Sequence, residues 1–158
     1  PKPQNPKTPK PLIMSIWKQD RYDDWVSLGV VGESGVGKTS VVYRYKENVF
    51  SFSKVPTIQI DRVKKVLMHE GKRIELWISD TGGQEKFHSV VKSTFKTSDV
   101  VIVMYSIDEQ SSLDQCKFWI DSVRDAKDVP MILVGNKSDS KERRVVSTES
   151  GMSYAEEN

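Results

Sequence analysis

Residues 32–40 read GESGVGKTS and directly follow the short, β-branched apolar run Val26–Val31. The spacing Gly-x-x-x-x-Gly-Lys-Thr, between a predicted strand and a predicted helix, is typical of a loop that binds phosphate groups. Backbone N–H groups of residues 34–39 can converge on phosphate oxygens, and the start of the following helix adds a favourable field. Lys38 can reach the outer phosphates, and the Thr39 hydroxyl can ligate Mg²⁺. The alternative is an incidental glycine-rich turn, which the strand–loop–helix context disfavours.

A second polar stretch, DTGGQE, begins at Asp80, where another strand pattern ends. The Asp80 carboxylate can hold Mg²⁺ through a water molecule, and the backbone N–H of Gly83 can approach a terminal phosphate. Gln84 can orient a water molecule that attacks this phosphate. Taken alone, the stretch is equally compatible with a tight Gly-Gly turn at the end of a strand.

A third stretch, Asn136-Lys137-Ser138-Asp139, follows the apolar run MILVG and indicates which base is bound. Guanine presents an N1–H and a 2-amino group side by side, and one carboxylate can accept both hydrogen bonds. Adenine has no such pair of donors, so Asp139 favours GTP over ATP. Asn136 can bond guanine and brace the phosphate loop, and the stem of Lys137 can lie along the base. A simple polar turn after a strand is the alternative.

Thr57 lies nineteen residues after Lys38 in a region that reads as a loop. Its hydroxyl can complete the coordination shell of Mg²⁺ only while a terminal phosphate is present. Loss of that phosphate would release the loop, so the loop would act as an order–disorder switch. A turn threonine after a proline is the commoner explanation of any single Pro-Thr pair.

The remaining pattern predicts the elements that position these loops. Apolar β-branched runs alternate with segments of helical spacing, which favours an α/β domain with a mixed, mostly parallel sheet. The predicted strands are Val26–Val31, Ile58–Met68, Ile74–Ile78, Val100–Tyr105 and Met131–Val134, the second and third forming a hairpin. The predicted helices are Lys38–Lys46, a helix from a capping box at Ser112 to about Ala126, and Glu149–Asn158 capped by Ser147 or Thr148. Residues 80–98 are polar and contain glycine, and they read as a loop that can include a short helix.

Composition excludes several classes of protein. The net charge of +2 arises entirely in residues 1–25, which hold five Lys/Arg and three Asp/Glu, while the remainder balances 19 against 19. No basic stripe of a nucleic-acid-binding protein is visible. No apolar run approaches the roughly 18 residues that a membrane span needs. Cys116 is the only cysteine, so no internal disulfide can form.

The N-terminal segment differs in composition from the rest of the chain. Five of the seven prolines fall within residues 1–11, interleaved with lysines, which favours an extended and mobile segment. We therefore expect a flexible extension over residues 1–24 and one domain over residues 25–158. The chain begins without methionine, and Met14 is a candidate for the biological start.

In this order, the four stretches resemble those of the small GTPases of the Ras superfamily, and most of all the Rab family. The similarity extends from about Val26 to Asn158 and includes PTI at 56–58, DTGGQEKF at 80–87, NKSD at 136–139 and KERRVVSTESG at 141–151. The resemblance implies a three-layer P-loop NTPase domain. It assigns nucleotide binding to Gly32, Glu33, Ser34, Gly35, Val36, Gly37, Lys38, Thr39, Ser40, Phe50, Thr57, Asp80, Gly83, Asn136, Lys137 and Asp139. It assigns Mg²⁺ binding to Thr39, Thr57 and, through water, Asp80, and catalysis to Gln84 and Lys38.

The resemblance also implies a function and its partners. The chain would alternate between GTP-bound and GDP-bound states as a molecular switch in vesicle trafficking, with slow Mg²⁺-dependent hydrolysis. An exchange factor, a GTPase-activating protein and effectors would bind through residues 48–62 and 80–97. The location would be cytoplasmic and on the cytosolic face of membranes, with membrane binding only through a lipidated C-terminal tail and without nucleic acid. Two alternatives stay open besides an ATPase or kinase of the P-loop class: a GTP-binding module without hydrolysis, and a non-functional fragment.

Several positions depart from the Rab pattern. Gln59-Ile60-Asp61-Arg62 replaces Gly-Val-Asp-Phe, Ser79 stands where Rab proteins place a tryptophan, and Gly82 replaces an alanine. Thr94-Phe95-Lys96-Thr97 replaces Tyr-Tyr-Arg-Gly. These positions shape the surface that partners recognise, and they leave the phosphate, magnesium and guanine residues intact. The family continues with one more strand, a final helix and a cysteine-bearing tail, so we expect a sheet without its last strand, marginal stability and weakened nucleotide affinity.

Overall fold

The structure, a computed structural model, describes residues 22–50, 61–81 and 88–158, with the side chains of Asp61 and of residues 88–92 left out. The predicted site residues Thr57, Gly83 and Gln84 lie outside the described residues. The strands are β1 (Asp24–Val31), β2 (Asp61–His69), β3 (Lys72–Asp80), β4 (Val100–Ser106) and β5 (Met131–Asn136). The helices are α2 (Lys38–Glu47), α3 (His88–Thr97), α4 (Gln110–Asp114), α5 (Cys116–Ala126) and α6 (Thr148–Glu157), with a 3-10 turn η1 at Lys141–Arg143.

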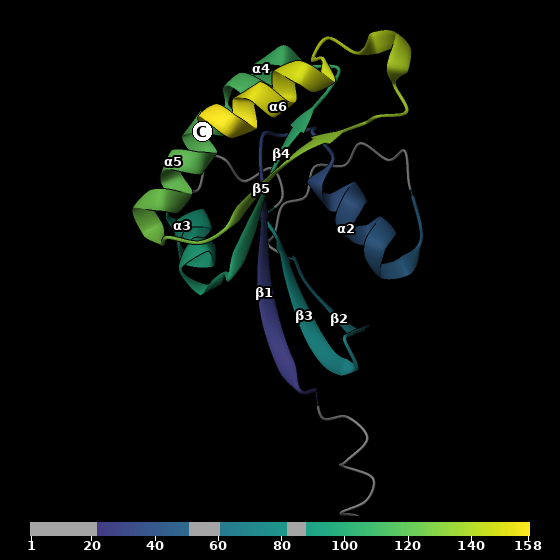
Figure 1. Cartoon of the computed structure of the whole chain (residues 1–158), viewed down its shortest axis with the longest axis vertical. Coiled ribbons are helices and arrows are strands. Elements are labelled where there is room, and N and C mark those ends of the chain that lie inside the picture. The colour runs from purple at the N-terminus through teal and green to yellow at the C-terminus, as the bar shows by residue number, and fades with distance from the viewer. Residues whose placement is uncertain (1–21, 51–60, 82–87) are drawn as a thin grey trace, which may run out of the picture.

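The described strands form one sheet in the order β2-β3-β1-β4-β5. β1 runs parallel to both β3 and β4, β4 runs parallel to β5, and β2 alone is antiparallel to its neighbour β3. Helix α2 covers one face of the sheet, and α3, α5 and α6 lie on the other side (Figure 1). The mixed, mostly parallel sheet between two helical layers confirms the predicted fold class.

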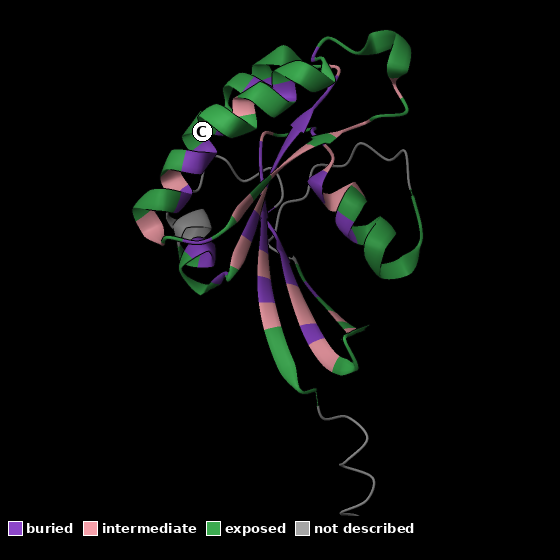
Figure 2. Ribbon diagram, in the orientation of Figure 1, coloured by how far each residue is buried: buried purple, intermediate pink, exposed green. Residues whose placement is uncertain are grey.

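Two clusters of buried side chains hold these layers together. The larger cluster joins α5 to β4 through residues such as Trp119, Val123 and Val103. The smaller one joins α2 to the opposite sheet face through Val42, Ile78 and other residues. Buried positions concentrate in the central strands and on the inner sides of the helices (Figure 2). Both faces of β1 and β4 are covered, which explains why these strands read as continuous apolar runs in the sequence.

One predicted helix is in fact two. Helix α4 begins at Gln110, and α5 begins at Cys116, so the prediction of a single helix opened by a capping box at Ser112 is wrong. Ser112 lies inside α4 and not at its N-cap, and its buried hydroxyl accepts from the backbone N–H of Ser106 at 2.9 Å and donates to the Glu109 carbonyl at 2.6 Å. The inner face of α5 was predicted correctly, since Cys116 and its helical neighbours are buried.

Other boundaries differ by smaller amounts. Helix α3 spans ten residues within the stretch that the sequence predicted as a loop able to include a short helix. Strand β1 begins at Asp24, and the N–H of Asp23 donates to the carbonyl of Arg73 at 2.7 Å, so pairing with β3 starts just before the predicted domain boundary. Ser147 caps α6 by accepting a hydrogen bond from the N–H of Ser150, as predicted. None of the described helices combines the length and apolar character that crossing a membrane requires.

Candidate functional site

The loop between β1 and α2 has a backbone that only glycine adopts without strain. Gly32, Gly35 and Gly37 have φ angles of 140°, 80° and 98°. A Cβ atom on Gly32 would overlap the carbonyl oxygen of Met104, and one on Gly37 would overlap the side-chain amide of Asn136. The loop is therefore packed tightly against β4 and the end of β5, and its shape depends on glycine at two of these three positions.

Lys38 lies at the first position of α2 and is almost fully buried. Its Nζ donates to the carbonyl oxygens of Gly32 at 2.5 Å and of Glu33 at 2.7 Å, so the side chain folds back across the loop. The first turn of α2 contains no acidic residue that would oppose the positive end of the helix dipole. A buried ammonium group and a helix N-terminus together favour an anionic ligand at this loop.

Asn136 connects the glycine-rich loop between β1 and α2 to the end of β5. Its Nδ2 donates to the carbonyl of Val36 at 2.8 Å, a contact between residues 100 positions apart in the chain. Asn136 pairs with Ser106 at the carboxyl ends of β5 and β4. The first and third sequence stretches thus meet at one edge of the sheet, where parallel α/β folds bind their ligands.

Asp80 and Thr39 lie at the same edge. Asp80 ends β3, is completely buried, and pairs with Val30 just before the loop begins. The next residue, Thr81, donates its hydroxyl hydrogen to the carbonyl of Val30 at 3.0 Å and so fixes the end of β3 against β1. Thr39 is half-buried in the first turn of α2. A carboxylate and a hydroxyl oxygen are the hard donors that Mg²⁺ prefers.

The donor set can be tested for its fit to Mg²⁺. Among the described residues no group of three or more acidic, histidine or cysteine side chains could hold a metal by itself. Mg²⁺ does not require such a cage, because it usually keeps several waters and uses one or two protein oxygens together with substrate phosphates. Thr39 and Asp80 fit that mode of binding, in which the ion would neutralise charge on the phosphates.

Lys137 is held by an acidic residue that the sequence analysis did not single out. Its Nζ lies 3.4 Å from Oδ1 of Asp108, and its backbone φ is 64°. A hydrogen bond from the Ser106 hydroxyl, with the nearby Lys137 charge, lowers the pKa of Asp108, so the carboxylate stays ionised at neutral pH. Asp108 follows the end of β4 by two residues, and the rule that ligands bind at carboxyl ends of parallel strands could have identified it.

Two predicted base-binding residues lie at the protein surface. Asp139 is exposed in the turn after β5, where the Ser140 N–H donates to the Lys137 carbonyl at 2.9 Å. Phe50 follows the end of α2 by three residues and is 54% exposed. The described contacts thus bring together the loop, Lys38 and Asn136, whereas Asp139 and Phe50 lie where a flat ligand can reach them from solvent.

The glycine-rich loop thus meets polar residues at the carboxyl ends of the strands. The sequence model described as "Ras family" matches residues 27–158. The chain belongs to the Ras family. Among curated proteins it is 38% identical to "Ras-related protein Rab-11B" of Dictyostelium discoideum over 143 residues, which cover 89% of this chain and 65% of that protein.

Two further curated relatives are similar over most of the chain. The chain is 36% identical to "Ras-related protein Rab-10" of Caenorhabditis elegans, with 86% of this chain and 69% of that protein covered. It is 35% identical to "GTP-binding protein ypt2" of Schizosaccharomyces pombe with the same coverage. The relatives confirm the predicted similarity to Rab proteins, and the chain spans about two thirds of the length of each of these relatives.

Proposed function

We propose that this Ras-family chain binds GTP and GDP with Mg²⁺, hydrolyses GTP slowly, and acts as a switch in vesicle trafficking. The observation that carries the proposal is the junction of Lys38, the loop carbonyls and Asn136 at the carboxyl edge of the sheet. This junction supports the simultaneous binding of phosphates and a base, because the two sequence stretches that would hold them are in direct contact. The similarity to the Rab relatives supports the trafficking role that the resemblance to Rab proteins implies.

Each group of residues would have a separate task. Lys38 and the backbone N–H groups of residues 34–40 would hold the phosphates. Asp139 and Asn136 would bind the base, and Lys137 and Phe50 would pack beside the base. Thr39, Thr57 and Asp80 would hold Mg²⁺. Gln84, with Gly83 near the terminal phosphate, would position the attacking water. Residues 48–62 and 80–97 would then present different surfaces to an exchange factor, an activating protein and effectors in the two nucleotide states.

The slow intrinsic hydrolysis that we propose is supported by the orientation of Arg44, which lies on the helix that follows the glycine-rich loop. Arg44 on α2 donates to the carbonyl of Asn48 at 3.0 Å, at the opposite end of the helix from the loop. It is therefore directed away from the phosphates. An arginine from an activating protein typically accelerates such reactions by about 10³- to 10⁵-fold.

For the location, we propose that the chain works in the cytoplasm and reaches membranes through a lipid anchor.

Base selection gives the first test of the proposal. Inosine triphosphate lacks the 2-amino group of guanine, so it offers Asp139 one hydrogen bond instead of two. We expect the chain to bind GTP about 10- to 100-fold more tightly than ITP, since a charged hydrogen bond contributes about 1.5–3 kcal/mol. The Asp139→Ala variant should bind both nucleotides with equal, weaker affinity in a fluorescent-nucleotide competition titration.

The control for this titration is Asp128→Ala, which removes an exposed carboxylate from the opposite end of β5. It should retain the preference for GTP. If ATP competes as well as GTP in the unmodified chain, the assignment of a guanine nucleotide is wrong. An ATPase or kinase of the P-loop class would then be the better explanation.

Gln84 provides the test of hydrolysis as distinct from binding. In single-turnover measurements, Gln84→Leu should slow hydrolysis by about 10- to 100-fold, because a poorly placed attacking water loses that much rate. Its affinity for GDP should not change. Gln115→Leu, a matched substitution at the exposed junction of α4 and α5, should leave the rate unaltered. Equal rates for Gln84→Leu and the unmodified chain would favour a GTP-binding module without hydrolysis.

A further inference from the structure

The turn that follows β4 holds Asp108 in a well-defined place. The N–H of Glu109 donates to the carbonyl of Ser106 at 3.1 Å and closes a tight turn, in which Asp108 is the third residue. The Ser112 hydroxyl accepts from the N–H of Ser106 at 2.9 Å and donates to the carbonyl of Glu109 at 2.6 Å. Ser112 therefore fastens both ends of the turn that carries the Asp108 carboxylate.

The neighbouring strand end brings Lys137 to this turn. Ser106 pairs with Asn136 in the parallel strands β4 and β5, and the N–H of Ile107 donates to the carbonyl of Asn136 at 3.1 Å. Lys137 follows directly and has a φ of 64°, in the left-handed region. Backbone geometry of this kind is uncommon outside glycine and is concentrated at functional sites. The Lys137 Nζ reaches Oδ1 of Asp108 at 3.4 Å, so the ion pair joins the two strand ends.

The ion pair is partly shielded from water. The Asp108 side chain is 15% exposed and the Lys137 side chain is 33% exposed. The Ser106 hydroxyl donates to Oδ1 of Asp108, the same oxygen that the Lys137 ammonium approaches. This hydrogen bond lowers the pKa of Asp108, and the Lys137 charge adds to the effect. Asp108 therefore presents a negative charge to Lys137 at neutral pH, and salt screens a shielded pair less than a fully exposed one.

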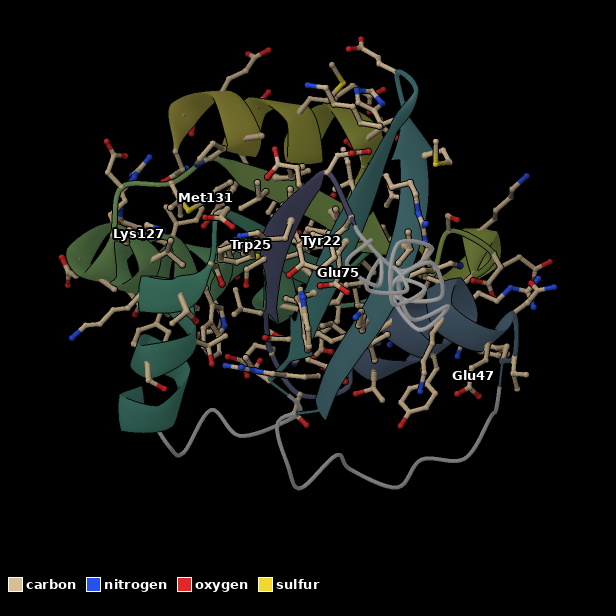
Figure 3. The ribbon with its side chains drawn as sticks, turned by 90° about the horizontal axis from the view of Figure 1, so that it is seen from below. Tyr22, Trp25, Glu47, Glu75, Lys127 and Met131 are labelled. Carbon is tan, nitrogen blue, oxygen red and sulfur yellow. The ribbon has the colours of Figure 1, made fainter. Side chains whose placement is uncertain are left out.

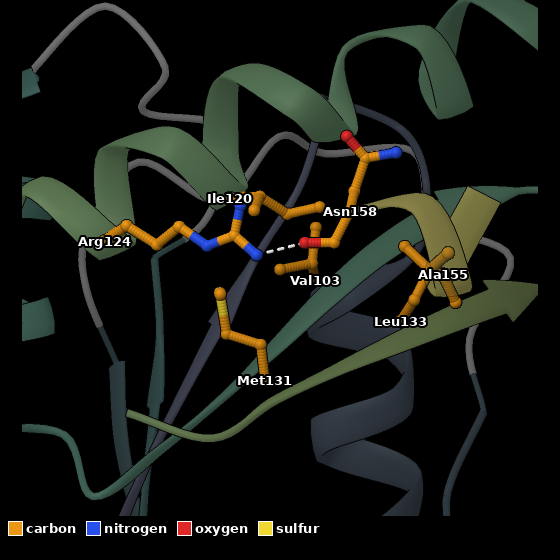
Figure 4. Close-up of a pocket in the computed structure, with 7 residues that line it drawn as sticks. All are labelled: Val103, Ile120, Arg124, Met131, Leu133, Ala155 and Asn158. Carbon is orange, nitrogen blue, oxygen red and sulfur yellow. Dashed lines mark hydrogen bonds between the residues drawn. The ribbon is translucent and has the colours of Figure 1, made fainter. Parts of the chain in front are cut away.

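The contact belongs to the strand end and not to the cavity farther along β5. That cavity is lined by Met131 and Leu133 of the same strand, and by other residues from β4 to the end of α6 (Figure 4). Neither Asp108 nor Lys137 is among its lining residues. An effect of changing the Asp108 side chain would therefore be transmitted through its described partners, Lys137 and Ser106.

We propose that Asp108 is a positioning residue for guanine nucleotides, which holds the Lys137 side chain in place so that its stem covers one face of the base. This role rests on the proposed function, in which Lys137 packs beside the base. A lysine side chain has a large conformational entropy, and part of it is lost when a ligand immobilises the side chain. Because the Asp108 carboxylate already holds the ammonium, the nucleotide has less ordering to impose and binds more tightly.

Nucleotide affinity in a double-mutant cycle tests the proposal. Asp108→Ala should weaken GDP binding by about 2- to 10-fold in a fluorescent-nucleotide titration, because the ligand must then order Lys137. In the Lys137→Ala background the same substitution should have no further effect, since Asp108 acts only through Lys137. An equal loss with and without Lys137 would overturn the proposal, and so would an unaltered affinity of Asp108→Ala.

The matched control is Asp114→Ala, which removes an exposed carboxylate from the nearby helix α4. It should leave GDP affinity unchanged in both backgrounds. A loss as large as that of Asp108→Ala would mean that any negative charge in this region supports binding, and the specific role of Asp108 would be wrong.

A neutral isostere separates positioning from a structural role. Asp108→Asn keeps an oxygen that accepts from the Ser106 hydroxyl and removes the charge, so it should reproduce most of the loss of Asp108→Ala. The same cycle run with Asp108→Asn gives the test even where Asp108→Ala does not fold. Full affinity of Asp108→Asn would assign the loss to the bond with Ser106 and overturn the proposal.

The choice of base gives a second readout. GTP and ITP differ at the edge of the base that Asp139 would bind, whereas Lys137 would cover its face. Asp108→Ala should therefore weaken both nucleotides equally, and a changed preference would contradict action through Lys137. A chain that binds no guanine nucleotide, or binds ATP as well as GTP, contradicts the proposed function and this role together. A chain that selects guanine nucleotides but fails the double-mutant cycle contradicts the role of Asp108 alone.

Discussion

Replacing Lys38 by alanine is expected to weaken GTP and GDP binding by about 10²- to 10⁴-fold. The Lys38 ammonium is buried and held between the Gly32 and Glu33 carbonyls, so it acts on bound phosphates from a fixed position. The two bonds to these carbonyls leave one N–H of the ammonium for phosphate, and a phosphate charge about 4 Å from the ammonium is attracted by about 4 kcal/mol at an effective dielectric constant of about 20, which lies within this range of affinities. Stopped-flow binding of a fluorescent GDP analogue measures the change.

The control is Lys46→Ala on the same helix. Lys46 lies in the last turn of α2, pairs with Glu47 at 3.0 Å, and is well exposed. Its removal deletes the same charge at the opposite end of α2, and nucleotide affinity should stay unchanged. Circular dichroism of Lys38→Ala checks that the loop change has not unfolded the domain. A folded Lys38→Ala chain with unaltered affinity would show that the loop does not bind phosphate in the proposed way.

Most elements of the fold could be predicted because they follow from local patterns. The runs Val26–Val31 and Val100–Tyr105 are buried on both faces, and such strands read as continuous apolar segments. Their observed counterparts β1 and β4 end within one residue of the predicted positions. The cap at Ser147 could also be predicted, since it needs only the three residues that follow it.

Features that depend on contacts between distant segments could not be read from the sequence. The break between α4 and α5 accompanies hydrogen bonds that tie Ser112 to the end of β4, and a local capping pattern cannot show them. The Lys64–Glu75 ion pair is a similar case, because Glu75 is buried among the strands beside Trp25 (Figure 3). A charged residue at that position reads as solvent-exposed in an alternating strand pattern.

In the candidate site, too, residues at strand ends could be predicted from the sequence, whereas contacts between distant segments could not. The loop, Asp80 and Asn136 could be located because each lies at or directly after the end of a strand, and parallel strands bring their carboxyl ends together. The hydrogen bond from Asn136 to Val36 and the ion pair of Lys137 with Asp108 required the structure. Neither contact can be deduced from sequence spacing, because each joins two segments whose relative positions along the strands depend on the register of the sheet.

Gly32→Ala is expected to lower the free energy of unfolding by about 3–5 kcal/mol. Gly32 has a φ of 140°, a region that is essentially restricted to glycine. Its added methyl group would also overlap the carbonyl oxygen of Met104 on β4. Because that obstacle is backbone, relief requires β1 and β4 to separate near their Val31–Val103 pair. Urea denaturation followed by circular dichroism measures the loss.

The Gly35→Ala variant separates backbone strain from the clash with β4, which are the two causes of the stability loss expected for Gly32→Ala. Gly35 also has a positive φ, of 80°, but no atom lies within 4 Å of the position that its Cβ would occupy. Its substitution should therefore cost only the conformational strain, about 1–2 kcal/mol. Equal losses for the two variants would mean that β4 moves away from Gly32 at little cost. A larger loss at Gly32 would show that contact with β4 fixes the start of the phosphate loop, and with it the carbonyl that positions Lys38.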